Sequence, residues 1–333
     1  MSAAEPAGAV LCLGDMVADI FATPVPRLPQ PGEMLLADRV AVFPGGNALN
    51  TAVALRRLGA QVAIAGSIGA DPLGDVLLAQ LAVIGLDVRG VQRQPGANTA
   101  ATLIFRVEGE DRRYVHSLGA AGRFTGEGVP ESLIPHHGIV FVGGYLKLAA
   151  WRDEALVATL EQARQRHCKV VLNVSIPRAS DVQMERCLRL LPHVDVFVPN
   201  EDEAHLLTGE RRPAAQALAL RQAGAGSVVI TRGPGGLYAD DSCRLIELGV
   251  FSVPLVDPSG CGDCFTAGLI MGLLQEWDML RTLEFASAVA ALGATALGCT
   301  SGVPALEEVL RFVEENDIEV LVRPAARERG TPP

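Results

Sequence analysis

The chain contains the stretch Val256-Asp257-Pro258-Ser259-Gly260-Cys261-Gly262-Asp263-Cys264-Phe265-Thr266-Ala267-Gly268, in which two glycines and an aspartate precede an apolar run that predicts a helix. The start of a helix directs unpaired N–H groups and the positive end of its dipole at the preceding turn, so the turn is a ready anion site. A carboxylate beside an anion suits a group that takes a proton from an attacking hydroxyl. The stretch therefore indicates phosphoryl transfer, with Asp263 as the base. The other interpretation is that Asp263 only stabilises the first helical turn.

Composition narrows the class of protein. The chain has 333 residues, 49% of them hydrophobic, which predicts a globular protein with one large α/β domain and an appendage, or two domains. A net charge of −10 argues against nucleic acid or an acidic membrane as partner. The first nine residues do not resemble a signal peptide, and the longest apolar runs are well short of the roughly 20 residues that a membrane span needs. We expect a soluble, cytoplasmic protein.

Short apolar runs alternate with helical patterns along most of the chain, and this alternation is regular from residue 139 onward. It predicts a mostly parallel sheet covered by helices on both faces, with ligands at the carboxyl ends of the strands. Residues 99–107 and 112–117 predict a hairpin that interrupts the alternation and belongs to a separate small sheet. A helix is predicted over 280–297. Residues 1–9 are expected to be flexible and residues 323–333 to be an unfolded tail.

The stretch from Asp257 to Phe265 resembles the signature of the PfkB carbohydrate kinases, the ribokinase-like family, with departures at Pro258, Ser259 and Cys261. This resemblance implies a ribokinase-like α/β domain over 10–322, with a small β-sheet lid formed by about 20–43 and 99–117. It also implies that ATP phosphorylates a hydroxymethyl group of a sugar or related polyol. In that reaction Asp263 is the general base, and the N–H groups of Gly260, Cys261 and Gly262 hold the transferring phosphoryl group.

The segment Pro44-Gly45-Gly46-Asn47-Ala48-Leu49-Asn50 resembles the N-terminal signature of the same family. There, Gly45 and Gly46 allow a sugar to approach the backbone closely, while Asn47 and Asn50 bind its hydroxyls. Taken without the resemblance, the segment is a strand-to-helix turn that Asn47 caps.

Asp19 falls where the family places an aspartate that binds two sugar hydroxyls after the first strand, and Asp15 is the near alternative. Either residue could instead serve the turn. A carboxylate that accepts hydrogen bonds from two hydroxyls recognises polyols specifically, because a missing hydroxyl leaves a carboxylate oxygen unpaired.

The resemblance implies a nucleotide site at the other end of the chain. Asn200 and Glu203 match a motif that organises Mg²⁺ and the phosphates through water, although an Asn-capped helix explains them equally well. Thr231 and Gly233 lie in a segment similar to the turn against the ATP phosphates. Ser287 occupies the place near the adenine.

Asp257 and Ser259 resemble residues that bind a monovalent cation, such as K⁺, in related enzymes. The resemblance also implies a homodimer formed through the lid. Two competing nucleotide sites are excluded, since the chain has no Gly-Lys for a Walker A loop and no complete dinucleotide fingerprint after its first strand.

The sequence does not identify the phosphoryl acceptor. Ribokinases carry Gly-Gly-Lys-Gly-Ala-Asn where this chain has Gly-Gly-Asn-Ala-Leu-Asn, and a Glu where it has Gly143-Gly144-Tyr145. Ketohexose, a deoxy-keto-acid, a nucleoside and a sugar phosphate all remain candidates, and Arg106, Arg112 and Arg113 could grip a phosphate. A sugar- or nucleotide-sensing protein without catalysis is the alternative outside enzymes, and the presence of Asp263 argues against it.

Overall fold

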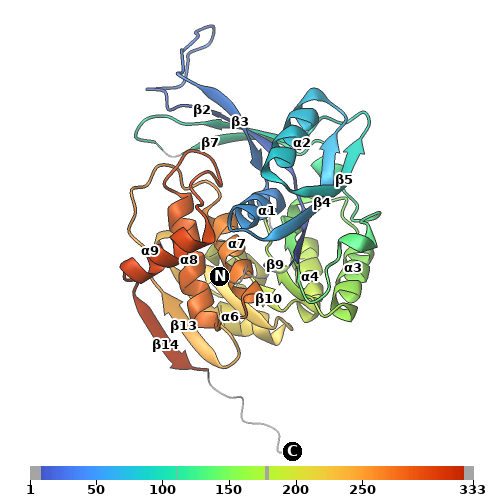
Figure 1. The fold of residues 1–333 in the computed structure, drawn as a ribbon, viewed down its shortest axis with the longest axis vertical. Coiled ribbons are helices and arrows are strands. Elements are labelled where there is room, and N and C mark those ends of the chain that lie inside the picture. Colours follow the sequence, from blue (N-terminus) through green and yellow to red (C-terminus); the bar gives the residue numbers. More distant parts are fainter. Residues whose placement is uncertain (1–8, 111, 177–179, 326–333) are drawn as a thin grey trace, which may run out of the picture.

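The computed structural model describes residues 9–110, 112–176 and 180–325, and within them a large sheet carries a smaller sheet above one end (Figure 1). The large sheet has ten strands, in the order β14 (Val320–Pro324), β13 (Arg244–Leu248), β12 (Leu237–Asp240), β11 (Ser227–Thr231), β10 (Val196–Phe197), β9 (Lys169–Leu172), β8 (Ile139–Gly143), β1 (Ala9–Gly14), β4 (Gln61–Gly69) and β5 (Asp87–Gln94). The strands from β11 to β5 pair in parallel, and β12, β13 and β14 extend this sheet with antiparallel pairs.

Both faces of the large sheet are buried, as parallel sheets require. Along β1 the side chains of Val10 and Cys12 enter one hydrophobic cluster, and those of Leu11 and Leu13 enter another on the opposite face. The helices that supply the first cluster are α1 (Asn47–Arg57), α2 (Pro72–Ile84), α7 (Cys261–Leu274), α8 (Met279–Gly293) and α9 (Leu306–Glu315). Those that supply the second are α3 (Asp153–Gln165), α4 (Asp181–Leu190), α5 (Glu201–Thr208) and α6 (Pro213–Gln222).

The small sheet confirms the predicted lid. It has the order β3 (Val40–Gly45), β2 (Val17–Ala22), β6 (Ala101–Phe105) and β7 (Arg113–Ser117), and β6 and β7 form the predicted antiparallel hairpin. Since β2 follows β1 after only two residues, the lid starts at the carboxyl end of a parallel strand. It lies on the side of the large sheet where the ligands of such sheets bind.

The small sheet also corrects the predicted lid segments. Strand β3 begins at Val40, whereas Met34 and Leu36 before it are 82% and 87% exposed and belong to no strand. The strand also continues through Pro44 and Gly45, because β2 pairs with β3 as far as the Val17–Gly45 register.

Three predicted boundaries need correction, and one strand was missed. Helix α8 ends at Gly293 instead of continuing to residue 297. The predicted tail begins too early, because Arg323 and Pro324 belong to β14, which pairs with β13. Strand β5 was not predicted, since its sequence is mainly polar. Ala9 starts β1, and the remainder of the predicted flexible terminus, 1–8, lies outside the described residues.

Within the described ranges, none of the helices combines the length and the apolar character that crossing a membrane requires.

Candidate active site

The predicted anion turn begins helix α7. Gly260 precedes the helix in the left-handed conformation, with φ of 75°, and a Cβ there would lie 2.6 Å from the Cys299 carbonyl oxygen. Both features require glycine at this position. Gly262 differs, because a Cβ added to it would meet nothing within 4 Å. Gly262 therefore borders open space in the first turn of a helix, where N–H groups have no partner within the helix. The Cys261 N–H makes a long contact of 3.4 Å with the Pro258 carbonyl.

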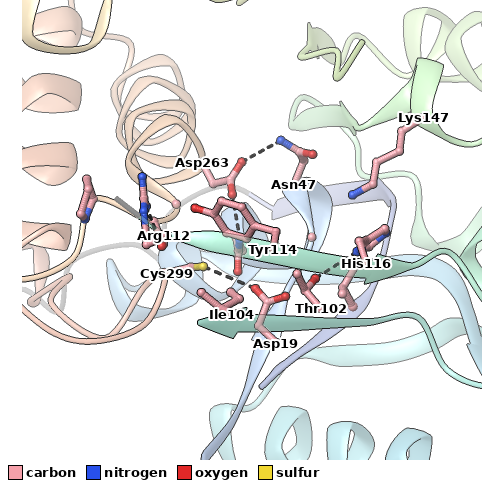
Figure 2. Close-up of a pocket in the computed structure, with 16 residues that line it drawn as sticks. Asp19, Asn47, Thr102, Ile104, Arg112, Tyr114, His116, Lys147, Asp263 and Cys299 are labelled. Atoms are coloured by element: carbon pink, nitrogen blue, oxygen red, sulfur yellow. Dashed lines mark hydrogen bonds between the residues drawn. The ribbon is translucent and has the colours of Figure 1, made fainter. Parts of the chain in front are cut away.

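Asp263 is held in place by helix α1. The side-chain amide of Asn47 donates to its Oδ1 at 3.0 Å, and that of Asn50 donates to its Oδ2 at 2.8 Å (Figure 2 shows the Asn47 contact). Burial raises the pKa of Asp263 to about 7, and the two amides oppose this rise because they stabilise the charged form. The carboxylate is thus oriented and poised to exchange a proton near neutral pH.

Asn47 and Asn50 both contact Asp263, which the sequence did not predict. They were predicted to bind hydroxyls, and that role stays a prediction, whereas their contacts with Asp263 are present. Asn50 is 4% exposed and its Oδ1 has no hydrogen-bond partner among the described residues. Gly46 immediately precedes α1 with φ of 93°, and a Cβ on Gly45 would lie 2.2 Å from a carboxylate oxygen of Asp19.

The two candidate aspartates, Asp19 and Asp15, differ in whether they face the pocket. Asp19 lies on β2 and lines a pocket of about 450 Å³ that also contains Asp263. Asp15 is fully buried and is not among the residues that line this pocket. Its Oδ1 accepts from the Ala48 N–H at 3.3 Å, and its Oδ2 accepts from Lys147 Nζ at 3.0 Å. Asp15 therefore supports the start of α1 and Lys147, while Asp19 faces the space where a substrate would lie.

Several residues of the pocket were missed in the sequence. The lid contributes Tyr114 and His116 of β7, in a row with Arg112 just before the strand, which the sequence had already suggested as a phosphate-binding residue (Figure 2). Thr102 on β6 forms a hydrogen bond of 3.0 Å with His116 Nδ1, and burial lowers the pKa of His116. The alternation of polar side chains over 112–116 is the signal that could have found them.

Lys147 and Cys299 complete the pocket from the main domain. Lys147 ends a short 3₁₀ turn, Tyr145–Lys147, which follows β8. Behind this turn the Tyr145 hydroxyl donates to Asp153, which also accepts from Arg186. The sequence carried no specific signal for either pocket residue.

Three of the predicted nucleotide residues, Asn200, Thr231 and Gly233, lie at the carboxyl ends of β10 and β11. Asn200 pairs with Thr231 in a short parallel bridge, and Gly233 follows in a 3₁₀ turn. Asn200 and Glu203 form a reciprocal capping box at the start of α5, as the alternative interpretation expected. Ser287 lies half-buried on α8.

Two features of this region go beyond a helix cap. Burial raises the pKa of Glu203 to about 7, and the Asp263 charge adds to that rise, so Glu203 lies within electrostatic reach of the predicted base. Asn173, which follows β9, was not predicted from the sequence. Its amide donates to the Val198 carbonyl, and its buried Oδ1 has no partner among the described residues.

The lid reaches the residues predicted to hold a monovalent cation. Asp257 is fully buried, and Arg112 Nη1 lies 3.7 Å from its Oδ1 and donates to Ser259 Oγ at 2.7 Å. Arg106, also from the lid, donates to the Val256 carbonyl at 2.8 Å. Arg113 lies on the opposite face of the strand and pairs with Glu110.

Comparison with known proteins shows the family and the fold of the chain. Residues 8–306 match the family described as pfkB family carbohydrate kinase. A ribokinase of Haemophilus influenzae is 28% identical over 91% of this chain and 97% of its own, and a 5-dehydro-2-deoxygluconokinase of Clostridium tetani is 26% identical over 83% and 85%. The structure of Arabidopsis thaliana ribokinase complexed with ribose and ATP superposes with a TM-score of 0.75, at 22% identity over 92% of this chain and 99% of that one.

Proposed function

Because the chain belongs to the pfkB family of carbohydrate kinases, which are ATP-dependent phosphotransferases, we propose that it transfers the γ-phosphate of ATP to a hydroxymethyl group of a sugar or related polyol. One observation carries this proposal. A carboxylate with a pKa of about 7, held by two amides, stands in the first turn of a helix beside an anion-binding turn, and it faces a polar pocket.

The residues support a direct displacement. As the sugar oxygen forms its bond to the γ-phosphorus, its proton passes to a carboxylate oxygen of Asp263, and the bond between the γ-phosphorus and the ADP oxygen breaks. The N–H groups at Gly260, Cys261 and Gly262 stabilise the charge on the transferring phosphoryl group. Asn47 and Asn50 keep the carboxylate oriented while it takes the proton.

The pocket lining supports a polyol as the acceptor. Asp19 accepts hydrogen bonds only, whereas Lys147 donates only, and Thr102 and His116 do both in their neutral forms. Adjacent hydroxyl groups can satisfy this set of donors and acceptors. Nucleosides and sugar phosphates are acceptors of the same chemistry and remain within the proposal as alternatives.

The test is a measurement of ADP release with a panel of sugars, sugar acids, nucleosides and sugar phosphates. We expect at least one polyol of the panel to stimulate ADP release strongly over ATP alone. If no member stimulates release while ATP binds, the kinase assignment is wrong and the sensing alternative replaces it.

For Mg²⁺ and ATP, the proposal places Asn200 and Glu203 beside the phosphates, with Thr231, Gly233 and Ser287 along the nucleotide. Asn200 and Glu203 would hold Mg²⁺ through water, and the bound ion would supply positive charge to neutralise the phosphates. The residues fit this role, because Mg²⁺ keeps several waters and takes oxygen ligands, and the buried Asn173 Oδ1, which has no hydrogen-bond partner among the described residues, lies in the same region.

We expect Asn200→Ala and Glu203→Ala to raise the concentration of Mg²⁺ needed for half-maximal rate, with little change in the KM for sugar. The physical reason is the loss of an oxygen that orders the metal's water shell. The measurement is a Mg²⁺ titration at saturating ATP and sugar. The control is Ser180→Ala. The Ser180 side chain caps α4 by accepting a hydrogen bond from the Gln183 N–H, so this variant also removes a helix cap, but at another helix. Titrations that match wild type would leave both residues with a capping role alone.

The rate should fall at acid pH through Asp263. Its carboxyl must be ionised to accept a proton, and its pKa is raised to about 7, so kcat/KM should decline as pH falls through about 7. The Asn50 hydrogen bond lowers this pKa, so Asn50→Ala should move the decline to higher pH. The check is kcat/KM against pH for both proteins. A midpoint unmoved by Asn50→Ala would assign the decline to another group.

We also propose that the outer face of the lid forms a homodimer. Thr102 and Ile104 of β6 point into the pocket, whereas Leu103 and Phe105 alternate with them and are 42% and 38% exposed. Val115 pairs with Leu103 on the same outer face and is 59% exposed. An apolar strip of this kind favours association with a second lid.

A further inference from the structure

Asp257 has a buried charge that needs a counter-charge. Its side chain is fully buried, and its two oxygens accept the N–H groups of Ser259 at 3.0 Å and Gly298 at 3.1 Å. These bonds tie the turn before α7 to the segment that follows α8. Two backbone donors stabilise a carboxylate but leave its net charge uncompensated, and a buried charge without a partner is strongly unfavourable.

The counter-charge comes from the lid. Arg112 immediately precedes β7, and its guanidinium donates to Ser259 Oγ at 2.7 Å and lies 3.7 Å from Asp257 Oδ1. The arginine side chain is 20% exposed, so this pair is largely shielded from water and salt. A second lid arginine, Arg106, holds the neighbouring Val256 carbonyl, so the contact of lid and turn does not depend on one side chain.

These are the residues that the sequence predicted to hold a monovalent cation, and they do not fit one in this arrangement. The Ser259 hydroxyl oxygen already accepts from Arg112. A monovalent cation bound to the same carboxylate would lie within a few ångströms of the guanidinium, where two positive charges repel each other strongly in a site shielded from water.

We propose that Arg112 takes the place of a monovalent cation at Asp257 and Ser259, and that it brings this charge to the anion-binding turn only when the lid covers the pocket. Arg112 is then a positioning residue. It acts through Ser259 and Asp257 on the Gly260 turn, which begins one residue after Ser259. The proposal rests on the proposed kinase activity only for its kinetic readout.

Two consequences separate this arrangement from a cation-activated one. The wild-type protein should not respond specifically to K⁺, because its site already contains a charge that cannot dissociate from the chain. Removal of the guanidinium should open a site for K⁺, since the buried Asp257 carboxylate and the Ser259 oxygen would then lack a cation.

The experiment compares wild type, Arg112→Ala, Arg112→Lys and the control Arg113→Ala, whose arginine lies one residue further on and faces outward to Glu110. Thermal melting is measured in KCl, NaCl and tetramethylammonium chloride at equal ionic strength. ADP release is measured in the same salts with the substrate found in the panel. The melting measurement does not depend on catalysis. It therefore tests cation binding even if the protein phosphorylates no compound of the panel.

For wild type, Arg112→Lys and Arg113→Ala we expect the same Tm in all three salts. For Arg112→Ala we expect KCl to raise the Tm by about 2 °C or more relative to tetramethylammonium chloride, as a bound ligand does. Its kcat should fall by about tenfold or more in tetramethylammonium chloride and recover in KCl, a loss that corresponds to one interaction with a charged group.

Two results would overturn the proposal. A wild-type Tm that rises in KCl as much as that of Arg112→Ala would mean that a cation binds beside the arginine. A melting temperature of Arg112→Ala that is as insensitive to K⁺ as that of Arg113→Ala would mean that no cation site lies beneath the guanidinium.

Discussion

Asp263→Asn should lose about 10²- to 10⁴-fold in kcat, the range for removal of a positioned general base. The amide that replaces the carboxylate cannot accept the hydroxyl proton of the sugar, and the other contacts of the site remain. The measurement is steady-state ADP release at saturating ATP and sugar. This is the largest effect we expect from a single substitution in the chain.

The same variant should fold normally and bind ATP as wild type does. Asn50 Oδ1 has no hydrogen-bond partner in the part of the chain that the structure describes, so rotation of the Asn50 amide would present an oxygen to the new amide donor. At neutral pH the raised pKa also means that the carboxylate destabilises the fold, because the native state holds the proton more tightly than the unfolded chain. The variant should therefore melt no lower than wild type at pH 7.5. Retention of more than about a third of the wild-type rate would remove Asp263 from the mechanism.

Asp19→Ala should raise the KM for sugar by about ten- to a hundredfold, with little change in the KM for ATP. This range corresponds to about 1.5–3 kcal/mol, the free energy of hydrogen bonds to a charged group. Asp19 is 6% exposed on the pocket side of the lid, and its burial raises its pKa above that of a free aspartate. Hydrogen bonds from two sugar hydroxyls would therefore stabilise the carboxylate more strongly here than in water. Steady-state kinetics with sugar and ATP varied separately gives the two KM values.

Asp15→Ala provides the contrasting control, because Asp15 is buried behind the pocket. Its loss leaves Lys147 without the carboxylate at 3.0 Å, so it should lower thermal stability substantially, as breaking a buried ion pair does. Asp19→Ala should melt close to wild type. If Asp15→Ala instead shows the larger rise in the KM for sugar with an unchanged Tm, the substrate lies against Asp15 and the assignment is reversed.

The local features of the site could be predicted from the sequence, because one short segment determines each of them. The Gly260 turn, the start of α7 and the capping box at Asn200 depend on residues within a few positions of one another. The contacts of Asn47 and Asn50 with Asp263 join residues more than 200 positions apart, and no periodicity along the chain encodes such a pair. For the same reason Lys147 could not be placed.

The errors in the fold also have physical reasons. Strand β14 has the sequence Val-Leu-Val-Arg-Pro, which is β-prone, but the basic and Pro-rich residues after it dominated the prediction of an unfolded tail. Strand β5 lies at the sheet edge, where polar side chains are tolerated and the hydrophobic alternation used to find strands is weak. The segment around Met34 shows the opposite error, because apolar residues there are exposed.

The residues proposed for the chemistry and those proposed for recognition of the sugar belong to two separate sheets. The turn at Gly260 and the base at Asp263 depend on helices packed against the large sheet, whereas Asp19, Thr102, Tyr114 and His116 project from strands of the small one. Evolution can therefore exchange the acceptor by substituting alternate residues of a few short strands without disturbing the phosphate machinery. Engineering of a new acceptor specificity would begin with a library at positions 102, 114 and 116, screened at constant ATP affinity.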